Sequence, residues 1–400
     1  MGWRTLDKGK SAKELGLRNV IRLGYVSLFT DISTEMILGV LPVNFIIGQL
    51  GATAAVLGLI EGSAEAANNL FRIFAGVLTD KIGRRKPIVV IGYGLSTLAK
   101  PLFAIANSWG QAFAVRVVDR AGKGTRTTPR DALISDSIPK SQAGKAFGLH
   151  GSIDQVGAVL GPLIAFALLP LIGLRNLFWI SFIPGVISLI ILVFFVADSC
   201  ARPKKWNLIE NARAVLTRDF ALLLVVLGIF TVGAYNFSFI LLEARSLGVG
   251  AGNIPLVYTL LNFATVIIGF PAGILADRVG KLPVLGISFV VFMGTSLAGI
   301  LLSGYWGFGF LIAVFYGGYL SISDTVQRAM IPDYTRPELK GTAYALYYTL
   351  IGVGSLIANS VFGALWTTLG SGMAFQFSIA TSAVAVVALI LFAVLHQRSG

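Results

Sequence analysis

Cysteine and histidine are nearly absent from this chain. One cysteine, Cys200, and two widely separated histidines, His150 and His396, occur among its 400 residues. A lone cysteine can form neither an intramolecular disulfide nor a thiolate cluster, and two distant histidines offer no pair at metal-ligand spacing. The sequence therefore predicts no disulfide framework and no metal site.

Charged residues are also scarce, and their scarcity indicates the class of protein. They make up 13% of the chain, whereas hydrophobic residues make up 55%, and the mean hydropathy is +0.79. Soluble globular domains contain about a quarter charged residues. We therefore predict an integral membrane protein.

The sequence also lacks the features of nucleic-acid binders and of ATPases. The net charge is +13, but the basic residues lie almost entirely in alternate loops, so we predict no nucleic-acid partner. A phosphate-binding glycine loop follows a strand, whereas Gly122-Lys123-Gly124 lies at an arginine-rich helix end with no preceding strand. Since no nucleophile and base converge either, we predict neither an enzyme nor a cofactor.

Apolar runs, in contrast, are abundant. A membrane helix needs about 20 residues to cross a hydrocarbon core of about 30 Å, and runs of this length predict twelve spans with short connections. The runs cover residues 20–50, 54–79, 88–107, 109–131, 144–173, 175–197, 219–245, 252–276, 283–303, 307–330, 341–367 and 372–396.

The basic residues predict the orientation of these spans. One side holds most of the loop lysines and arginines: Lys81, Arg84, Arg85, Lys86, Lys140, Arg202, Lys204, Lys205, Arg213, Arg218, Arg278, Lys281, Arg336 and Lys340. The other side has only Arg175 and, near a helix end, Arg245. Because cytoplasmic loops retain positive charge, we place both termini in the cytoplasm and the protein in the plasma (bacterial inner) membrane.

Four segments follow from this reading. Residues 1–19 form a cytoplasmic arm, without the apolar core and cleavage site of a signal peptide. Residues 20–197 and 219–396 form two six-helix bundles, and residues 198–218 form a cytoplasmic linker between them. Within the linker, 207–217 has the pattern of a short amphipathic surface helix.

The two bundles are related by an internal repeat. The loop that begins at Gly76 recurs 197 residues later at Gly273, and Ala132-Leu-Ile-Ser-Asp136 matches Ala329-Met-Ile-Pro-Asp333 at the same offset. Two motifs that share one offset indicate a duplicated unit, which in an apolar chain predicts two pseudo-symmetric membrane bundles with a site at their seam.

Ionisable residues inside the spans are the candidates for function, since each is costly unless it faces a partner or a polar cavity. Asp31 and Glu35 share one face of the first span through their i,i+4 spacing. The first half adds Glu61, Glu65, Arg72, Lys100, Arg116, Asp119, Arg120, Lys123 and Asp154. The second half is poorer, with Glu243, Arg245, Asp324 and Arg328. Ion coupling is therefore expected in the first half.

The chain resembles the major facilitator superfamily over its full length. The loop between the second and third spans resembles that superfamily's first signature, and a shorter copy lies between the eighth and ninth spans. The residues that carry this likeness are Gly76, Asp80, Gly83, Arg84 and Arg85, with Asp277 and Gly280 in the copy. The resemblance implies an all-α fold of twelve transmembrane helices in two bundles, and a gating role for the loop. We expect Asp80 to accept hydrogen bonds from a helix N-terminus across the seam.

Two further motifs match the superfamily only in part. Arg116 lies where the buried-arginine signature has its arginine, but Asp119 and Arg120 stand where glutamine and glycine are usual. Gly157, Gly161 and Pro162 resemble the signature of proton-exchanging exporters, although Ala165 and Phe166 replace its paired glycines. The resemblance favours export.

A coupling hypothesis follows from these residues. Asp31 and Glu35 exchange protons, and Arg116 and Arg120 hold them ionised until substrate or conformational change weakens the pairing. Glu61, Glu65, Arg72 and Asp154 either lock the seam or take part in coupling. Substrate hydrogen bonds are expected from residues around the central cavity: Asn44, Tyr235, Asn236, Tyr258, Asn262, Tyr316, Tyr319, Asp324 and Arg328.

The sequence thus predicts a proton-coupled secondary transporter. The favoured reading is an efflux antiporter of small organic molecules that works by alternating access as a monomer, with membrane lipid around it and a proton gradient as its driving force. The alternative is an importer of a small anionic metabolite or metal chelate, with Arg116, Arg120 and Lys123 as anion receptors.

Overall fold

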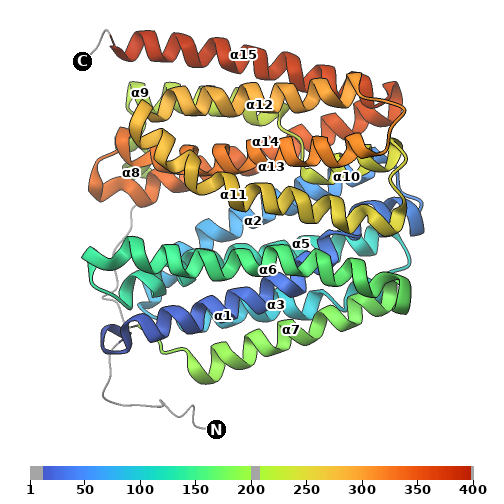
Figure 1. Cartoon of the computed structure of the whole chain (residues 1–400). Coiled ribbons are helices and arrows are strands. Elements are labelled where there is room, and N and C mark those ends of the chain that lie inside the picture. Colours follow the sequence, from blue (N-terminus) through green and yellow to red (C-terminus); the bar gives the residue numbers. More distant parts are fainter. Residues whose placement is uncertain (1–11, 200–207, 398–400) are drawn as a thin grey trace.

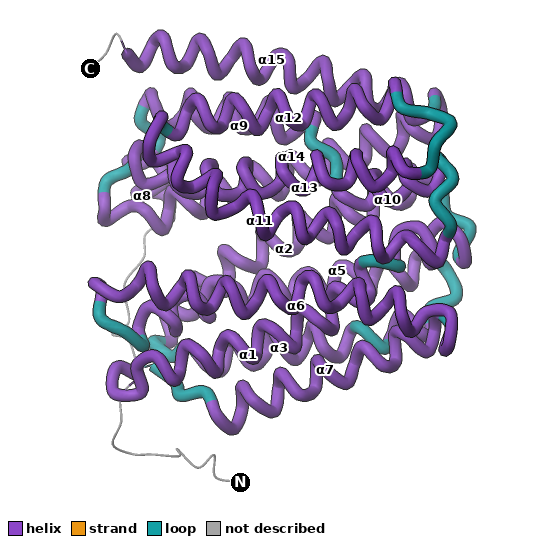
Figure 2. Tube along the Cα trace, viewed as in Figure 1, coloured by secondary structure: helices purple, strands orange, loops and turns teal. Residues whose placement is uncertain are grey.

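The computed structural model describes residues 12–199 and 208–397, and in this part of the chain every regular element is a helix. Figure 1 shows long helices lying side by side, with the first half of the chain in the lower part of the view and the second half above it. The loops gather at the two ends of these helices (Figure 2).

The first half contains seven α-helices and two short elements. They are α1 (Ala12–Leu38), the π-helical η1 (Leu41–Gln49), α2 (Ala54–Ile82), α3 (Lys86–Ala99), α4 (Leu102–Ile105), α5 (Trp109–Asp136), η2 (Lys140–Gln142), α6 (Ala143–Ile172) and α7 (Leu174–Phe195). Pro101 separates α3 from α4, since proline cannot supply the backbone N–H that a continuous helix needs.

The second half repeats this plan. Its elements are α8 (Leu208–Val215), α9 (Arg218–Gly233), α10 (Phe237–Ser246), η3 (Ala251–Asn253), α11 (Ile254–Val279), α12 (Lys281–Leu301), α13 (Gly307–Met330), η4 (Ile331–Tyr334), η5 (Pro337–Leu339), α14 (Lys340–Leu369) and α15 (Ser371–Gln397). Asn236 begins α10 as its N-cap, where its side chain accepts a hydrogen bond from the backbone N–H of Ser238 at 2.9 Å.

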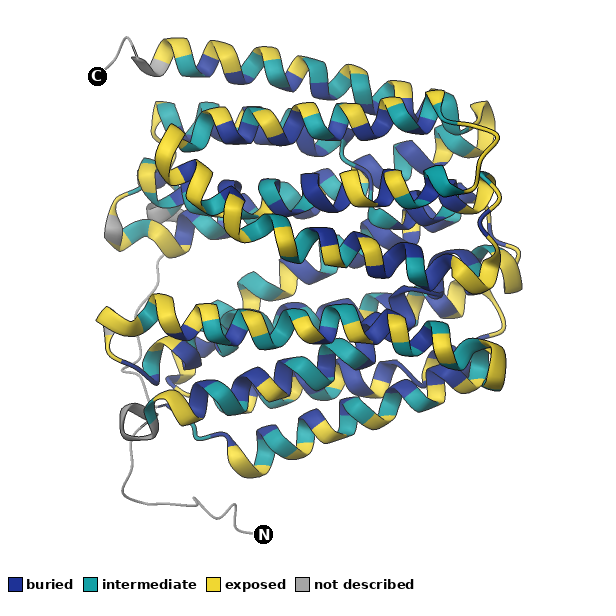
Figure 3. Ribbon diagram, viewed as in Figure 1, coloured by how far each residue is buried: buried dark blue, intermediate teal, exposed yellow. Residues whose placement is uncertain are grey.

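Ten helical stretches among the described residues are long and apolar enough to cross a membrane. The helices α2 and α5 are 29 and 28 residues long but carry too many charged side chains to be recognised by composition. The outer surface is apolar, with Leu171 and Phe270 each 78% exposed, and buried residues line the inward helix faces (Figure 3). The membrane assignment is confirmed, while the count of twelve spans stays a prediction.

Each half packs mainly on itself. In the first half α1 packs on α6 and α7, and α5 packs on α2 and α3; in the second α13 packs on α11 and α12, and α15 on α9 and α12. Two long helix pairs, α2 with α14 and α6 with α11, join the halves, with smaller contacts of η1 with α10 and of α6 with η3. The seam between the halves is therefore formed mainly by four helices.

Glycines bring α2 and α14 close together. A Cβ added at Gly58 would lie 2.0 Å from the carbonyl oxygen of Asn359, and one added at Gly363 would lie 2.4 Å from that of Ala54. Small residues allow such backbone contact between membrane helices.

Two segments differ from their predicted bounds. The first helix begins at Ala12, inside the segment predicted as an arm, and Gly16 interrupts it with φ 48° and ψ −134°. The predicted amphipathic helix of the linker is α8, which spans Leu208–Val215. Cys200 and Asn207 lie outside the described residues.

Candidate functional site

The most deeply buried charges join α2 to α5. The Arg116 guanidinium lies 2.7 Å from Glu61 Oε2 and 3.5 Å from Asp119 Oδ2, and all three side chains are at most 4% exposed. Asp119 also accepts a hydrogen bond from Ser96 at 2.6 Å. This group ties three helices of the first half together, because Glu61 belongs to α2, Ser96 to α3, and Arg116 and Asp119 to α5.

In this conformation Arg116 therefore pairs with acids other than Asp31 and Glu35, and its predicted role as their partner stays a prediction. Although α5 contacts both α1 and α2, its contact with α2 is the more extensive. The guanidinium reaches the acids of α2 and its own helix instead. The sequence could not show this, since it does not fix which helices are neighbours.

Asp31 and Glu35 line the contact between α1 and α6. A Cβ added at Gly157 would lie 3.1 Å from Asp31 Cβ, and one added at Gly161 would lie 2.7 Å from Glu35 Cβ. The two glycines of the exporter-like motif thus share the i,i+4 spacing of the two acids, and each glycine packs against one acid. Pro162 follows on α6, where it is buried beside Gly39.

Asp154 lies one turn before Gly157 on α6 and belongs to the same group. It interacts electrostatically with Asp31, and its Oδ1 is buried without a hydrogen-bond partner among the described residues. Asp154 belongs to α6, one of the seam helices, and lies beside Asp31 of α1.

Glu35 is also tied to the second half. The Tyr258 hydroxyl donates a hydrogen bond of 2.5 Å to Glu35 Oε2, and the two residues are 4% and 8% exposed. The Tyr258 ring stacks on Phe237 with 4.7 Å between centroids. Tyr258 was predicted to bind substrate, but in this state its hydroxyl contacts Glu35.

Arg120 and Lys123 face these acids without pairing to them. Arg120 is 6% exposed and has Asp119, Glu65, Glu61 and Glu35 as its nearest acidic neighbours, while Lys123 interacts with Asp31 and Glu35. Neither side chain forms a hydrogen bond or a close ion pair with any residue that the structure describes. Their charges therefore remain available to a ligand or to a carboxylate that moves.

Glu65 and Arg72, predicted to share a face of α2, have separate partners. Glu65 Oε1 accepts hydrogen bonds of 3.0 Å from both Asn68 and Asn69. The Arg72 guanidinium lies 4.4 Å from the centroid of the Tyr348 ring on α14. Arg72 therefore contacts the other half by a cation–π interaction, which its sequence position did not indicate.

The signature loop between α2 and α3 is held by acids of its own half. Gly83 ends α2 with φ 72°, and Gly76 packs against the Thr128 side chain of α5. Arg85 pairs with Asp80 at 2.8 Å and with Asp136 at 3.4 Å. In this conformation Asp80 pairs with Arg85 of its own half, and its expected contact with a helix N-terminus across the seam stays a prediction.

A third acid, missed by the sequence reading, completes the loop. Asp198 pairs with Arg84 at 3.1 Å, and its Oδ1 accepts hydrogen bonds from the backbone N–H groups of Arg85 and Lys86 at 3.2 and 2.8 Å. Because Asp198 follows α7 directly, it ties the end of the first half to the signature loop.

The second copy of the loop follows the same plan. Gly280 has φ 97°, and Lys281 pairs with Asp333 at 2.6 Å. Asp277 is exposed beside a small cavity of about 390 Å³ that Gly280, Lys281 and Asp333 also line. The two repeated motifs therefore belong together, since Asp136 and Asp333 each bind the basic loop of their own half.

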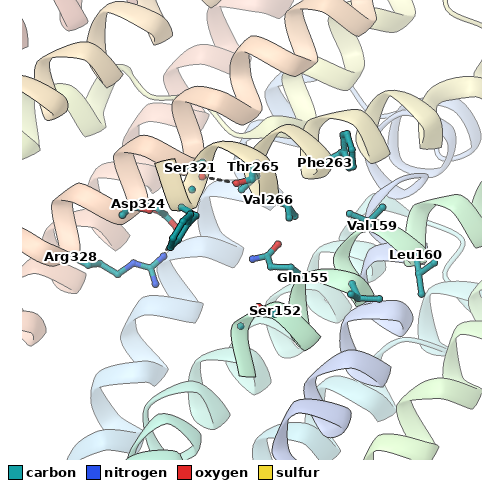
Figure 4. Close-up of a pocket in the computed structure, with 15 residues that line it drawn as sticks. Ser152, Gln155, Val159, Leu160, Phe263, Thr265, Val266, Ser321, Asp324 and Arg328 are labelled. Atoms are coloured by element: carbon teal, nitrogen blue, oxygen red, sulfur yellow. Dashed lines mark hydrogen bonds and ion pairs between the residues drawn. The ribbon is translucent and has the colours of Figure 1, made fainter. Parts of the chain in front are cut away.

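A larger cavity of about 740 Å³ lies between the halves. It separates α6 from α11 and α13, and it is lined by both apolar and polar side chains, among them Ser152, Gln155, Val156, Phe263, Asp324 and Arg328. Figure 4 shows Ser152 and Gln155 on one wall and Asp324 and Arg328 on the other. Asp324 and Arg328 form an ion pair with each other.

Of the residues predicted for substrate contact, Asp324 and Arg328 line this cavity and the others lie outside it. The others bridge helices or end them. Asn44 donates to Ala251 O, Asn262 to Ala158 O and Tyr316 to Tyr235 O; Asn236 caps α10; and Tyr235 and Tyr319 pack on Phe292. Their predicted role in substrate contact stays a prediction. Ser152 and Gln155, polar at i,i+3 on an apolar helix, also line the cavity, and the sequence prediction did not include them.

The sequence profile described as Major Facilitator Superfamily matches residues 23–242 and 220–399. The chain belongs to the major facilitator superfamily. An uncharacterized MFS-type transporter of Methanocaldococcus jannaschii is 31% identical over 365 residues, which cover 87% of this chain and 88% of the relative. The solved structure of the nucleoside transporter NupG has a TM-score of 0.73 at 13% identity, covering 95% of this chain and 99% of that one.

A shorter likeness is to a drug-resistance protein. The quinolone resistance protein NorA of Staphylococcus aureus is 29% identical over 170 residues, which cover 42% of each chain. Together the matches show the family and the fold: an all-α integral membrane transporter in two bundles.

Proposed function

We propose that this protein is a proton-coupled efflux antiporter of small organic molecules, located in the plasma membrane with both termini in the cytoplasm. The observation that carries the proposal is that the halves touch at one end and separate at the other. The "basic end" is the end of the bundle at which α2 is followed by α3 and α11 by α12, and the residues around these two connections include Lys81, Arg84, Arg85, Arg278 and Lys281. The helix α8 lies at this end, at the left of Figure 1.

The cavity extends from the middle of the bundle toward the basic end. Its walls come from residues 151–160 of α6 and 263–270 of α11, near the middle of these helices, and from residues 321–328 of α13, which lie nearer the basic end. At the opposite end the halves are joined by hydrogen bonds from Asn44 to Ala251 O at 3.0 Å and from the Ala55 N–H to Thr367 Oγ1 at 2.8 Å. A cavity open to one side is what alternating access requires, and positive charge marks that side as cytoplasmic.

The proton site in this proposal is the group of Asp31, Glu35 and Asp154. These acids lie at the edge of the seam, face two unpaired cations and rest on the glycines of the exporter-like motif. Protons and a substrate that draws on the same charges would compete, which gives antiport. The partial likeness to a quinolone resistance protein supports export.

Transport into proteoliposomes tests the proposal. A thermal-shift screen of purified protein against compound classes at two pH values identifies a ligand, and its uptake is then followed with an imposed pH gradient. We expect Glu35→Gln and Asp31→Asn to abolish gradient-driven uptake while downhill exchange continues. Unchanged gradient-driven uptake in both variants would remove these acids from the mechanism.

A second candidate is import of a small anion together with protons. Arg120 and Lys123, which have no close partner among the described residues, support it; Arg116, bound to Glu61 and Asp119, does not. Counterflow separates the candidates, because symport accelerates uptake when protons flow inward with the substrate, whereas antiport accelerates it when they flow outward.

A further inference from the structure

We infer that Tyr258 is the residue that links protonation of Glu35 to the closure of the seam. The inference rests on the proposed function and names the contact by which a proton would change the conformation. Tyr258 belongs to the second half and Glu35 to the first, so their 2.5 Å hydrogen bond spans the seam.

This hydrogen bond differs chemically from the others that cross the seam. Among the described residues, the remaining side-chain hydrogen bonds between the halves are Asn44 to Ala251 O, the Ala55 N–H to Thr367 Oγ1, and Asn262 to Ala158 O. Each of these pairs an amide or a hydroxyl with a backbone group, and none of them titrates. Only the contact of Tyr258 has a carboxylate as its acceptor.

The strength of this contact depends on the charge of Glu35. A phenol donates a shorter and stronger hydrogen bond to a carboxylate than to a neutral carboxylic acid. Ionised Glu35 therefore holds α11 against α1 and keeps the opposite end closed. A protonated Glu35 holds Tyr258 more weakly, so that protonation shifts the equilibrium toward the state that is open at the opposite end.

The groups around Glu35 fit this role. Asp31 repels the ionised carboxylate from the same helix, Lys123 and Arg120 attract it from α5, and Tyr258 contacts it from α11. On α6, Gly161 presents no side chain to it. The two cations lie in the first half with Glu35, so Tyr258 is the group that connects its charge to the other half.

The packing of the Tyr258 ring allows the hydrogen bond to be tested by removing the hydroxyl alone. The ring is held by Phe237 within the second half, so Tyr258→Phe deletes the hydroxyl and keeps the ring. Tyr316→Phe is a matched control, because the Tyr316 hydroxyl is equally buried but donates to Tyr235 O, within the second half, at 2.7 Å.

The experiment measures the distance between spin labels at the opposite end as pH is varied. Cys200 is the only cysteine, so a Cys200→Ser background accepts labels at Gln49→Cys and Gly252→Cys, both exposed there. We expect the parent to open at this end as the pH falls. At high pH the ratio of open to closed protein should be at least about tenfold higher in Tyr258→Phe than in the parent, because a hydrogen bond to a charged group is lost. This ratio should change little with pH in the variant.

The control and a second variant decide between outcomes. Tyr316→Phe should behave as the parent, and Glu35→Gln should be open and insensitive to pH whether or not Tyr258→Phe is added. If Tyr258→Phe titrates as the parent does, or adds its full effect to Glu35→Gln, the inference is wrong. If Tyr258→Phe does not fold, a Glu35→Gln protein that closes normally overturns the inference.

Failure of the proposed function would look different. A parent protein that opens with pH through Tyr258 but shows no gradient-driven transport would refute proton coupling and keep the link. If the parent shows gradient-driven transport and Tyr258→Phe opens with pH as the parent does, proton coupling is kept and the link through Tyr258 is refuted.

Discussion

At the scale of single residues, the first half separates its charges into two groups with different chemistry. Glu61, Arg116 and Asp119 form close ion pairs with one another in the interior, as a structural group does. Asp31, Glu35 and Asp154 lack close cationic partners, while Arg120 and Lys123 face them unpaired. An ionised group without a partner is energetically costly in a membrane. Stability alone therefore does not account for the second group.

Substitution of Arg116 tests the structural group. We expect Arg116→Gln to destabilise the protein by about 3–5 kcal/mol, because it leaves two buried carboxylates uncompensated. Arg328→Gln is the control: it removes an ion pair whose side chains are 51% and 56% exposed, and such pairs contribute about 0–1 kcal/mol.

Thermal unfolding in detergent measures both variants. Equal midpoints for Arg116→Gln and Arg328→Gln would show that Arg116 is not needed for packing. Adding Glu61→Gln to Arg116→Gln should recover part of the loss, since it removes one of the two stranded charges.

At the scale of elements, glycines decide which helices approach and where the acids lie. The paired spacing of Asp31 with Glu35 and of Gly157 with Gly161 makes α1 and α6 fit at one register. The α2 and α14 pair uses Gly58 and Gly363 in the same way at the seam.

A single methyl group on α6 tests this fit. We expect Gly161→Ala to lower stability by about 1–3 kcal/mol through overpacking, because its Cβ would lie 2.7 Å from Glu35 Cβ and 2.9 Å from Ile32 O. Gly148→Ala, on the same helix with no atom within 4 Å of the added Cβ, should be neutral.

The readouts are the thermal midpoint and ligand-dependent transport of the folded fraction. Gly161→Ala should lose transport beyond its loss of folded protein, since the methyl displaces Glu35. A Gly161→Ala variant as stable and active as Gly148→Ala would show that α1 and α6 can move apart at no cost.

Much of this arrangement was predictable from the sequence, but its pairings were not. The repeat, the loop motifs and the membrane helices follow from apolar length, glycine spacing and loop charge, and the structure contains them. The i,i+4 placement of Asp31 and Glu35 also holds, because it depends only on helix geometry. Which side chains meet depends on packing between distant segments, so the ion pair of Arg116 with Glu61 was not predicted.

The residues predicted for substrate contact show a second limit of sequence-based prediction. Tyr235, Tyr316 and Asn262 have the polarity expected of a binding site, yet each satisfies its hydrogen bond within the protein. Polar side chains in an apolar bundle must find such partners, so their residue type does not distinguish structure from function. Only the position of Asp324 and Arg328 in the cavity does.

At the scale of the whole molecule, the repeat produces two helix bundles that meet mainly along four helices. The sequences of the two copies have diverged, so the two bundles differ in their buried charges. Both copies keep the basic loop and the acid that binds it, Asp136 or Asp333. The buried charges remain mainly in the first copy, while the second contributes Tyr258 as the contact to Glu35. In the proposed mechanism the first half binds the proton and the second half responds through Tyr258.

The central claim is that protons and substrate exchange at the acids of the first half, and proton release on ligand binding tests it most directly. Purified protein in weakly buffered solution is mixed with a ligand from the thermal-shift screen while the pH is recorded. We predict release of protons by the parent and none by the Asp31→Asn, Glu35→Gln double variant. Proton uptake, or binding with no proton change in the parent, would contradict antiport.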